Sequence, residues 1–495
     1  MENIKSRSIL FGIATLLVMI LISSWIKYHD VNKNEGIDNI EASYHSLLIS
    51  KSLNEGRISE HHFLPIVTQG GDENKDIPWG AAVRDKSGGY IYTSFPSLGF
   101  LVPAAVIKLL SLDYTISNLS LINLVILAAT ALIFYLLLIY IFKPNKSLGA
   151  VLVALACSPL ILSRESLAST GLLYWPQSLS QLFIATFLLS SCKVQNANNN
   201  AWMIAAGLSI YLLAMTEWTG YVIGGLSAIY FILNKSRRNI RLGITLISSL
   251  SIAAITFLSQ LHLTLDLKEF FSSSVARFLV RSGGGADFKS LFLGYYQSFG
   301  FFLITLPVFF LSKLLNKNSS NDTFNLLILL SSFSLLENII LAQHATSYTF
   351  DRLKLSFMIS AMICNLVLAH KGKQVLIYMI FIIYSCLMSF NSYRADVKQF
   401  QGWSDIQRAN TVIANKIIDT KGFYCASIYN NTRVRAYLNL LMGRSIWERL
   451  PNDNELHVSG ECPVIVITGD IPFKDLQRVT SVNIYRNGKL EEVIE

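Results

Sequence analysis

The stretch of sequence that decides the fold runs from Leu119 to Phe142 and reads LSLINLVILAATALIFYLLLIYIF. It contains no charged residue. A transmembrane helix needs about 20 consecutive, mostly apolar residues to cross about 30 Å of hydrocarbon. The stretch therefore predicts a helix that spans a membrane.

The composition of the whole chain indicates the same class of protein. Of its 495 residues, 52% are hydrophobic and only 15% are charged, and the mean hydropathy is +0.44. A soluble globular protein with so little charge would have a poorly solvated surface. The sequence therefore predicts a polytopic membrane protein.

Further apolar runs of spanning length, or close to it, recur along the chain. The first, Ile9 to Ile26, follows Lys5 and Arg7 as a secretory signal would, but it is long for a signal and no small-residue cleavage pattern follows it. We interpret it as an anchor. The others are Leu148 to Leu162, Leu172 to Ser191, Trp202 to Met215, Tyr221 to Leu233, Leu242 to Leu261, Phe292 to Leu311, Phe324 to Leu341, Leu355 to Leu368 and Val375 to Phe390. Together they predict an all-α bundle of about 11–13 transmembrane helices.

Basic residues occur in alternate loops from Phe142 onward. They are Lys143, Lys146, Lys193, Lys235, Arg237, Arg238, Arg241, Lys313, Lys317, Lys371 and Lys373. Loops rich in lysine and arginine lie on the cytoplasmic side, so this bias explains much of the net charge of +9 without nucleic acid as a partner. The opposite loops (163–171, 216–220, 262–291 and 342–352) and the region after 391 are expected on the non-cytoplasmic side of a bacterial inner (plasma) membrane.

The run Leu98 to Leu110 is short and contains Pro103 and Lys108. If this run and the helix ending at Phe142 both crossed the membrane, Lys143 would lie outside, against the charge bias. We therefore interpret Leu98 to Leu110 as a juxtamembrane or re-entrant helix, which leaves the number of crossings open by one.

The chain divides into four predicted parts. They are an N-terminal anchor (1–27), a first external loop (28–97), a multi-pass bundle (98–390) and a small external α/β domain (391–495). In the last part, an amphipathic stretch from Asp405 to Ile418 precedes predicted strands at Phe423 to Tyr429, Val464 to Thr468 and Val482 to Tyr485, the last turning at Asn487-Gly488.

Two cysteines of the external domain border predicted strands. An oxidising compartment would permit a disulfide between Cys425 and Cys462, and two buried thiols are an equal alternative. The other four cysteines lie in or at the end of apolar runs and indicate core packing.

The first external loop has the densest set of polar groups, including Asp38, Glu41, Tyr44, His62 and Tyr92. Glu41 starts an amphipathic stretch, so a helix would place its carboxylate near the N-terminus, where free amides and the helix dipole stabilise the anion. One interpretation is that Glu41 or Asp38 caps this helix. The other is a general base that removes a proton from an acceptor.

Arginines of the external loops form a second group. Arg277 and Arg281 are four residues apart, so a helix would project both from one face above the membrane. Their guanidinium groups suit a phosphate or pyrophosphate, although snorkelling to ordinary lipid phosphates is an equal alternative. Arg352, which follows His344, repeats the pattern, but Asp351 beside it weakens the signal.

Other candidates are less specific. Trp175 and Trp218 fit an interfacial aromatic belt, whereas an acid at a helix end, such as Glu217, is rarer. His61 and His62 lack further spaced ligands, so no metal site is predicted, and a need for a divalent metal stays open. The sequence contains no Walker loop, dinucleotide fingerprint or GxSxG motif.

The arrangement resembles the GT-C superfamily of integral-membrane glycosyltransferases, which includes protein O-mannosyltransferases and aminoarabinose transferases of lipid A. A single anchor precedes a large external loop. In it, Ile40 to Gly56 (IEASYHSLLISKSLNEG) looks like the acidic pair and Tyr-containing helix of that family, and Gly89 to Gly99 (GYIYTSFPSLG) looks like its lead into the next hydrophobic helix.

The resemblance implies inverting transfer of a sugar from a polyprenyl-phosphate donor to an envelope glycan, lipid or protein acceptor at the outer face. The acidic pair would map onto Ile40 and Glu41. Because Ile40 replaces the first acid, the base stays open between Glu41 and Asp38. The donor phosphate would be held by Arg277 or Arg281 first and by Arg352 second.

Two rival functions share the bundle. A polysaccharide polymerase or ligase would use the same donor, but its principal loop is expected late in the chain. A transporter or flippase is expected to have charged residues within its spans and an internal repeat, and we find no repeat.

Overall fold

Several helical segments are long and apolar enough to cross a membrane. The computed structural model describes residues 2–71, 75, 82–196, 199–283, 288–315, 321–400, 403, 407, 411, 414–415, 424–428, 432–445, 447–448, 464–468, 482–486 and 489–494. Within these ranges the 7 candidate spans are Ser8–Asn32, Ile116–Phe142, Arg237–Thr264, Phe288–Leu315, Asp322–Ile340, Thr349–Ala369 and Lys373–Gln399. The prediction of a polytopic all-α membrane bundle is confirmed.

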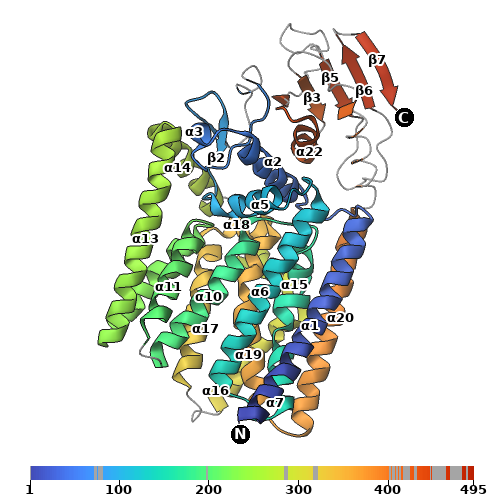
Figure 1. Ribbon diagram of the computed structural model, residues 1–495. Coiled ribbons are helices and arrows are strands. Elements are labelled where there is room, and N and C mark those ends of the chain that lie inside the picture. The colour runs from blue at the N-terminus through green and yellow to red at the C-terminus, as the bar shows by residue number, and fades with distance from the viewer. Residues whose placement is uncertain are drawn as a thin grey trace.

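The bundle contains shorter helices beside these spans. Its helices are α1 (Glu2–Asn32), α6 (Ile116–Phe142), α7 (Ser147–Ala156), α8 (Ser158–Leu162), α9 (Arg164–Ser169), α10 (Pro176–Asn196), α11 (Asn200–Ala214), α12 (Thr219–Leu233), α13 (Arg237–Thr264), α15 (Phe288–Phe299), η1 (Gly300–Ile304), α16 (Thr305–Leu315), α17 (Asp322–Ile340), η2 (Thr349–Lys354), α19 (Leu355–Ala369) and α20 (Lys373–Gln399). The central α6 packs against both α1 and α10 (Figure 1).

Local sequence sets the ends of α6. The Thr115 hydroxyl accepts a hydrogen bond from the Asn118 amide at 3.3 Å, which satisfies one of the unpaired donors of the first turn. At the other end Lys143 adopts a left-handed backbone conformation (φ 45°), and its amide donates to Ile139 O.

Two predicted spans are interrupted. The run Leu148 to Leu162, expected as one helix, is broken at Cys157 between α7 and α8, and Pro159, which lacks an amide proton, occupies the first turn of α8. The run Phe292 to Leu311 is broken where Gly300 has φ +51°, and η1 separates α15 from α16. The segment Phe288–Leu315 as a whole is still long and apolar enough to cross a membrane, so the predicted span Phe292 to Leu311 is confirmed. The run Leu148 to Leu162 is instead divided between two short helices.

One end of the bundle is covered by short helices and a β-hairpin from the segments that connect the bundle helices, and we call it the capped end. It carries α2 (Glu41–Glu55), α3 (Ile58–His61), the hairpin β1 (Ala82–Arg84) and β2 (Tyr90–Tyr92), α5 (Leu98–Leu109), α14 (Leu267–Gly283) and α18 (Ala342–Ser347). Figure 1 shows α5 lying across this end. With 12 residues, α5 is too short to cross a bilayer.

The C-terminal region forms a sheet beyond the capped end (Figure 1). Its strand order is β4 (Trp447–Glu448), β3 (Tyr424–Ile428), β5 (Val464–Thr468), β6 (Val482–Arg486) and β7 (Lys489–Ile494). The pairs β3–β4 and β3–β5 are parallel, whereas β5–β6 and β6–β7 are antiparallel. With α22 (Thr432–Met442) between β3 and β4, this confirms the small C-terminal α/β unit of the predicted fold class.

The C-terminal region is docked on α2. The buried Tyr44 ring packs against Trp403 and Tyr437, with ring centroids 5.9 and 4.7 Å away. Lys51 Nζ donates to Leu440 O at 2.9 Å, so α22 covers one side of α2. Cys462 is not among the described residues, so the alternative of a disulfide with Cys425 stays a prediction. Most of the amphipathic stretch 405–418 also lies outside the described residues.

Candidate active site

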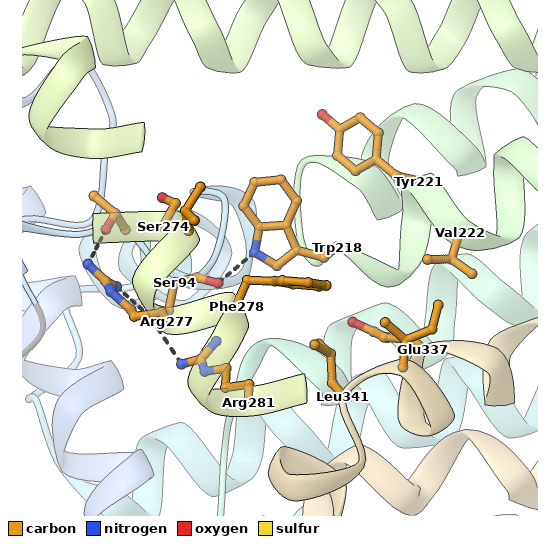
Figure 2. A pocket seen from close by; sticks show the side chains of 13 residues that line it. Ser94, Trp218, Tyr221, Val222, Ser274, Arg277, Phe278, Arg281, Glu337 and Leu341 are labelled. Carbon is orange, nitrogen blue, oxygen red and sulfur yellow. Dashed lines mark hydrogen bonds between the residues drawn. The ribbon is translucent and has the colours of Figure 1, made fainter. Parts of the chain in front are cut away.

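A cavity of about 440 Å³ opens at the capped end, between α14 and the adjoining ends of α12 and α17. It is lined by Thr93, Ser94, Trp218, Tyr221, Val222, Ser274, Val275, Arg277, Phe278, Arg281, Glu337, Ile340 and Leu341. Figure 2 shows two arginines beside Ser94 on one side of the cavity, with Tyr221 and Val222 on the other. The cavity therefore combines a cationic wall with an apolar one.

The cationic wall is made by Arg277 and Arg281, which project from α14 as the four-residue spacing predicted. Arg277 donates to the Ser94 hydroxyl at 2.8 Å and to the Thr93 hydroxyl at 2.7 Å, and Arg281 donates to Ser94 at 3.2 Å. Burial lowers the pKa of Arg277, and the neighbouring Arg281 charge lowers it further. In the described part of the chain neither guanidinium has a carboxylate within 4.0 Å.

The apolar wall is made by Trp218, which the sequence indicated only as a membrane-interface residue, and by apolar side chains of α12, α14 and α17. The Trp218 indole donates to Ser94 O at 2.7 Å, which fixes the ring beside the hydroxyl that both arginines contact. Phe278 lies on the same helix as the arginines, and Ile340 and Leu341 close the cavity from the end of α17. An elongated apolar group with an anionic head fits such a lining.

Tyr348 connects several predicted residues. Its ring lies 4.5 Å from the His344 ring, measured between centroids. Burial raises the pKa of Tyr348, the nearby Tyr92 and Glu41 raise it further, and Arg281 opposes them. Tyr348 therefore interacts electrostatically with both a candidate base, Glu41, and a candidate phosphate ligand, Arg281. The sequence did not predict a role for Tyr348.

The two candidate bases, Asp38 and Glu41, lie at the N-terminus of α2. Glu41 is the first residue of the helix and half-buried, as the amphipathic pattern predicted. Both carboxylate oxygens of Asp38 accept hydrogen bonds from Asn39, one from its backbone amide at 2.9 Å and one from its side chain at 3.1 Å. Asp38 also acts electrostatically on Arg164 and Asp396, on the α9 and α20 side.

Glu217 belongs to a buried charge cluster that borders the cavity, which we call the Lys354 cluster. Lys354 Nζ donates to Glu217 at 2.7 Å, to Glu337 at 2.6 Å and to the Thr219 hydroxyl at 2.6 Å. Burial raises the pKa of Glu217 to about 7, with the Glu337 carboxylate adding to the shift and the Lys354 ammonium opposing it. Glu337 also lines the cavity, so the cluster supports one of its edges.

His344 and Arg352 are held by protein groups. His344 pairs with Asp351, whose other oxygen accepts from Gln177 at 2.6 Å. Arg352 is 1% exposed and donates to Ser298 at 2.8 Å and to Ala345 O at 3.1 Å. Ser298 in turn donates to Glu165 at 2.8 Å. Arg352 therefore joins a buried network and does not line the cavity.

Tyr44 and His62 lie elsewhere. Tyr44 is buried against the C-terminal region, and His62 Nδ1 is 3.0 Å from the Thr264 hydroxyl at the end of α13. His61 Nδ1 accepts from the Phe63 amide at 3.0 Å, so the two histidines do not converge. Among the described residues no group of three or more histidines, cysteines and acids is placed to hold a metal ion.

The structure also reveals groups that sequence reasoning missed. Thr93, Ser94 and Tyr348 have no distinctive local pattern. Lys354 repeats the basic pattern with Arg352, but its buried contacts with Glu217 and Glu337 were not predicted. The only sequence signal for Thr93 and Ser94 is their place in the stretch Gly89 to Gly99, which carries part of the family resemblance.

Sequence comparisons give no relative. No protein-family model matches the chain, and none of the curated proteins matches it. Comparison of structures gives clear matches to two membrane glycosyltransferases. Archaeal oligosaccharyltransferase AglB from Archaeoglobus fulgidus, in complex with an inhibitory peptide and a dolichol-phosphate, matches with a TM-score of 0.57 and 12% identity over 92% of this chain and 69% of that chain.

The second match is ArnT from Cupriavidus metallidurans bound to undecaprenyl phosphate, with a TM-score of 0.56 and 10% identity over 96% of each chain. ArnT in the apo state matches with a TM-score of 0.52 over 92% of this chain and 93% of that chain. The chain has the GT-C fold. At these identities the likeness confirms the fold predicted from the sequence, and the GT-C fold here includes both the bundle and the capped end.

Proposed function

We propose that the protein is a glycosyltransferase that moves a sugar from a polyprenyl-phosphate donor to an envelope glycan, lipid or protein acceptor. The cavity at the capped end carries the proposal. Its apolar wall fits isoprenoid units, and Arg277 and Arg281 fit the phosphate at their polar end.

The solved structures of the same fold support this choice of donor. One holds a dolichol-phosphate and the other undecaprenyl phosphate, and both are polyprenyl phosphates. An AglB structure with a tethered acceptor peptide has the same fold too. A lipid-linked sugar is therefore the donor class that agrees best with both the fold and the lining of this cavity.

The proposed reaction is a single displacement at the anomeric carbon. Glu41 takes the proton of the acceptor hydroxyl or amine, and the freed lone pair forms the new bond to the anomeric carbon from the face opposite the leaving group. The bond from that carbon to the phosphate oxygen breaks, and polyprenyl phosphate leaves with the electron pair. Arg277 and Arg281 stabilise the negative charge that develops on it, and the configuration inverts.

We favour Glu41 over Asp38 as the base. Glu41 acts electrostatically on Tyr348, which also feels Arg281 from the cationic wall. Asp38 instead acts on Arg164 and Asp396 and is engaged by Asn39. Tyr92, which acts electrostatically on Arg277, and Glu217, which binds Lys354 in the cluster at the edge of the cavity, are proposed to contact substrate or to support its contacts. Tyr44 and His62 retain only their structural contacts in this proposal.

The proposed orientation places the capped end on the non-cytoplasmic side of the membrane. Arg237 and Arg238 at the start of α13, and Lys371 and Lys373 at the start of α20, lie at the other end of the bundle (Figure 1). Basic residues at that end favour its cytoplasmic placement.

The experiment is complementation of a strain that lacks the gene, with the envelope glycan, lipid A and glycoproteins profiled by mass spectrometry. Glu41→Gln is expected to lose the modification that the wild type restores, and Arg277→Gln with Arg281→Gln is expected to reduce it at least about tenfold. Matched controls are Glu55→Gln, at the exposed end of the same α2, and Lys268→Gln, exposed on α14. Both controls should restore it fully.

A reaction with purified protein separates transfer from transport. The transferase releases polyprenyl phosphate from a synthetic lipid-linked sugar, whereas a flippase leaves that bond intact. Full activity of Glu41→Gln would eliminate Glu41 as the base, and Asp38→Asn would then be decisive for the second candidate. An intact donor with every acceptor class tested would refute the proposed function.

A further inference from the structure

A second arginine cluster lies at the end of the bundle opposite the capped end. Arg237, Arg238 and Arg241 begin α13 and line a cavity of about 300 Å³. The remaining lining residues are Val194, Asn199, Asn200 and Met203. Figure 1 shows that α13 runs from this end of the molecule to α14 at the capped end, so the cluster is separate from Arg277 and Arg281.

Hydrogen bonds fix the start of α13 and the side chain of Arg238. The Ser236 hydroxyl caps α13 by accepting from the Asn239 amide at 3.1 Å. Arg238 donates to Val194 O at 3.2 Å and to Gln195 O at 2.7 Å, near the end of α10, which orients its side chain across the cavity. Arg237 and Arg241 are four residues apart on the helix, so they share one face and stay exposed.

The positive charge of this cavity is not neutralised by the described part of the protein. No carboxylate there lies within 4.0 Å of any of the three guanidinium groups. The sequence has no acidic residue between Glu217 and Asp266. The first turns of α11 and α13, where unpaired amides accumulate, border the same cavity and add to its positive potential.

The surroundings also resemble a lipid headgroup level. Lys193 Nζ lies 3.7 Å from the Tyr140 ring centroid and 5.7 Å from that of Trp202, an aromatic pair of the kind that marks a membrane interface. Beyond Met203, the apolar side chains of Ile204 on α11 and Ile244 on α13 are 67% and 55% exposed. An acyl chain would have apolar surface to lie on next to the arginines.

We propose that this cavity binds a phosphate group, with Arg237 and Arg241 as its main ligands and Arg238 as the fixed third. Guanidinium groups bind phosphate through paired hydrogen bonds, and a hollow with three of them favours a dianion or monoanion over water. Loop charge alone explains why basic residues occur here, but it does not explain why three of them line one hollow, with Arg238 held there by two backbone carbonyls. The ligand is the phosphate of an anionic lipid headgroup or of a soluble phosphate compound.

The test uses the full-length protein purified in a neutral detergent, with binding measured by native mass spectrometry. The probes are phosphatidylglycerol, the zwitterionic phosphatidylcholine and inorganic phosphate. The variant is Arg237→Gln with Arg241→Gln. The matched control is Lys371→Gln with Lys373→Gln, which removes the same charge from exposed positions at the same end of the bundle.

The wild type and the lysine control are expected to bind phosphatidylglycerol equally, and the arginine variant at least about tenfold more weakly. Displacement of the lipid by millimolar inorganic phosphate would support the site and identify a soluble phosphate compound as a competent ligand. Absence of displacement would support the lipid headgroup. Equal losses in both variants, no loss in either, or equal binding of phosphatidylcholine would overturn the proposal. Arg237→Lys with Arg241→Lys keeps the charge but loses the paired guanidinium donors, so it is expected to bind phosphatidylglycerol more weakly than the wild type and more tightly than the glutamine variant.

Discussion

Replacing Lys354 with methionine tests the Lys354 cluster, because methionine has a similar length and no charge. Lys354 is fully buried, and its ammonium donates to Glu217 at 2.7 Å and to Glu337 at 2.6 Å. Without it, two buried carboxylates would remain next to each other. Removing one partner of a buried ion pair costs about 3–5 kcal/mol. We therefore expect the free energy of unfolding of Lys354→Met to fall by about 3–5 kcal/mol.

A companion variant separates lost charge from lost packing. Lys354→Met combined with Glu217→Gln and Glu337→Gln removes every charge of the cluster, and replacing a whole buried ion cluster is often close to neutral. This triple variant should regain most of the lost stability. The assay is equilibrium unfolding of the purified protein in mixed micelles, followed by circular dichroism.

The pH dependence of the single variant gives a further check. Burial already raises the pKa of Glu217 to about 7 in the presence of the lysine. An acid with a raised native pKa binds more protons when folded than when unfolded, so stability increases as the pH falls through that interval. The deficit of Lys354→Met should therefore shrink between about pH 8 and about pH 5. Wild-type stability of Lys354→Met, or a triple variant as unstable as the single one, would refute the reasoning.

Two further predictions concern the capped end and α12. A Cβ at Gly99 would lie 2.6 Å from Pro176 Cβ, so Gly99→Ala should reduce the free energy of unfolding by about 1–3 kcal/mol and lower the thermal midpoint. Gly225→Ala, with no atom within 4 Å of the new carbon, should leave the midpoint unchanged or raise it. Equal effects of the two substitutions would contradict the packing at Gly99. Burial lowers the pKa of His61, so the native state binds fewer protons than the unfolded state below about pH 6.5. The free energy of unfolding should therefore fall by up to about 1.4 kcal/mol for each pH unit as the pH decreases below that value. His61→Gln should flatten that part of the stability profile, and an unchanged slope would rule out His61 as its source.

The membrane spans were predictable because spanning is a local property of composition. The uncharged run Leu119 to Phe142 became α6, and Val464 to Thr468 became β5 with the predicted bounds. The interruptions were harder to predict. An apolar run such as Leu148 to Leu162 has the right composition for a span, but Pro159 and the packing around it end one helix and begin another.

The candidate site was predictable only in part, because its partners are distant in sequence. Arg277 and Arg281 share a helix face, so their spacing sufficed to place them together. Arg352 showed the same local pattern, yet its guanidinium meets Ser298, which is 54 residues away, and it is buried. No periodicity or spacing connects such residues. The choice between a buried network and an open cavity depends on how the helices pack.

The contact between α2 and α22 has a consequence for the order in which the protein is completed. Lys51 and Leu440, which are joined by a hydrogen bond, are 389 residues apart in the chain. A ribosome makes the N-terminal partner first, and domains fold as they emerge. The helix that begins with Glu41 therefore stays uncovered on one side until nearly the whole polypeptide has been synthesised. Chains released early would therefore leave Tyr44 and Lys51 on α2 without their partners Tyr437 and Leu440.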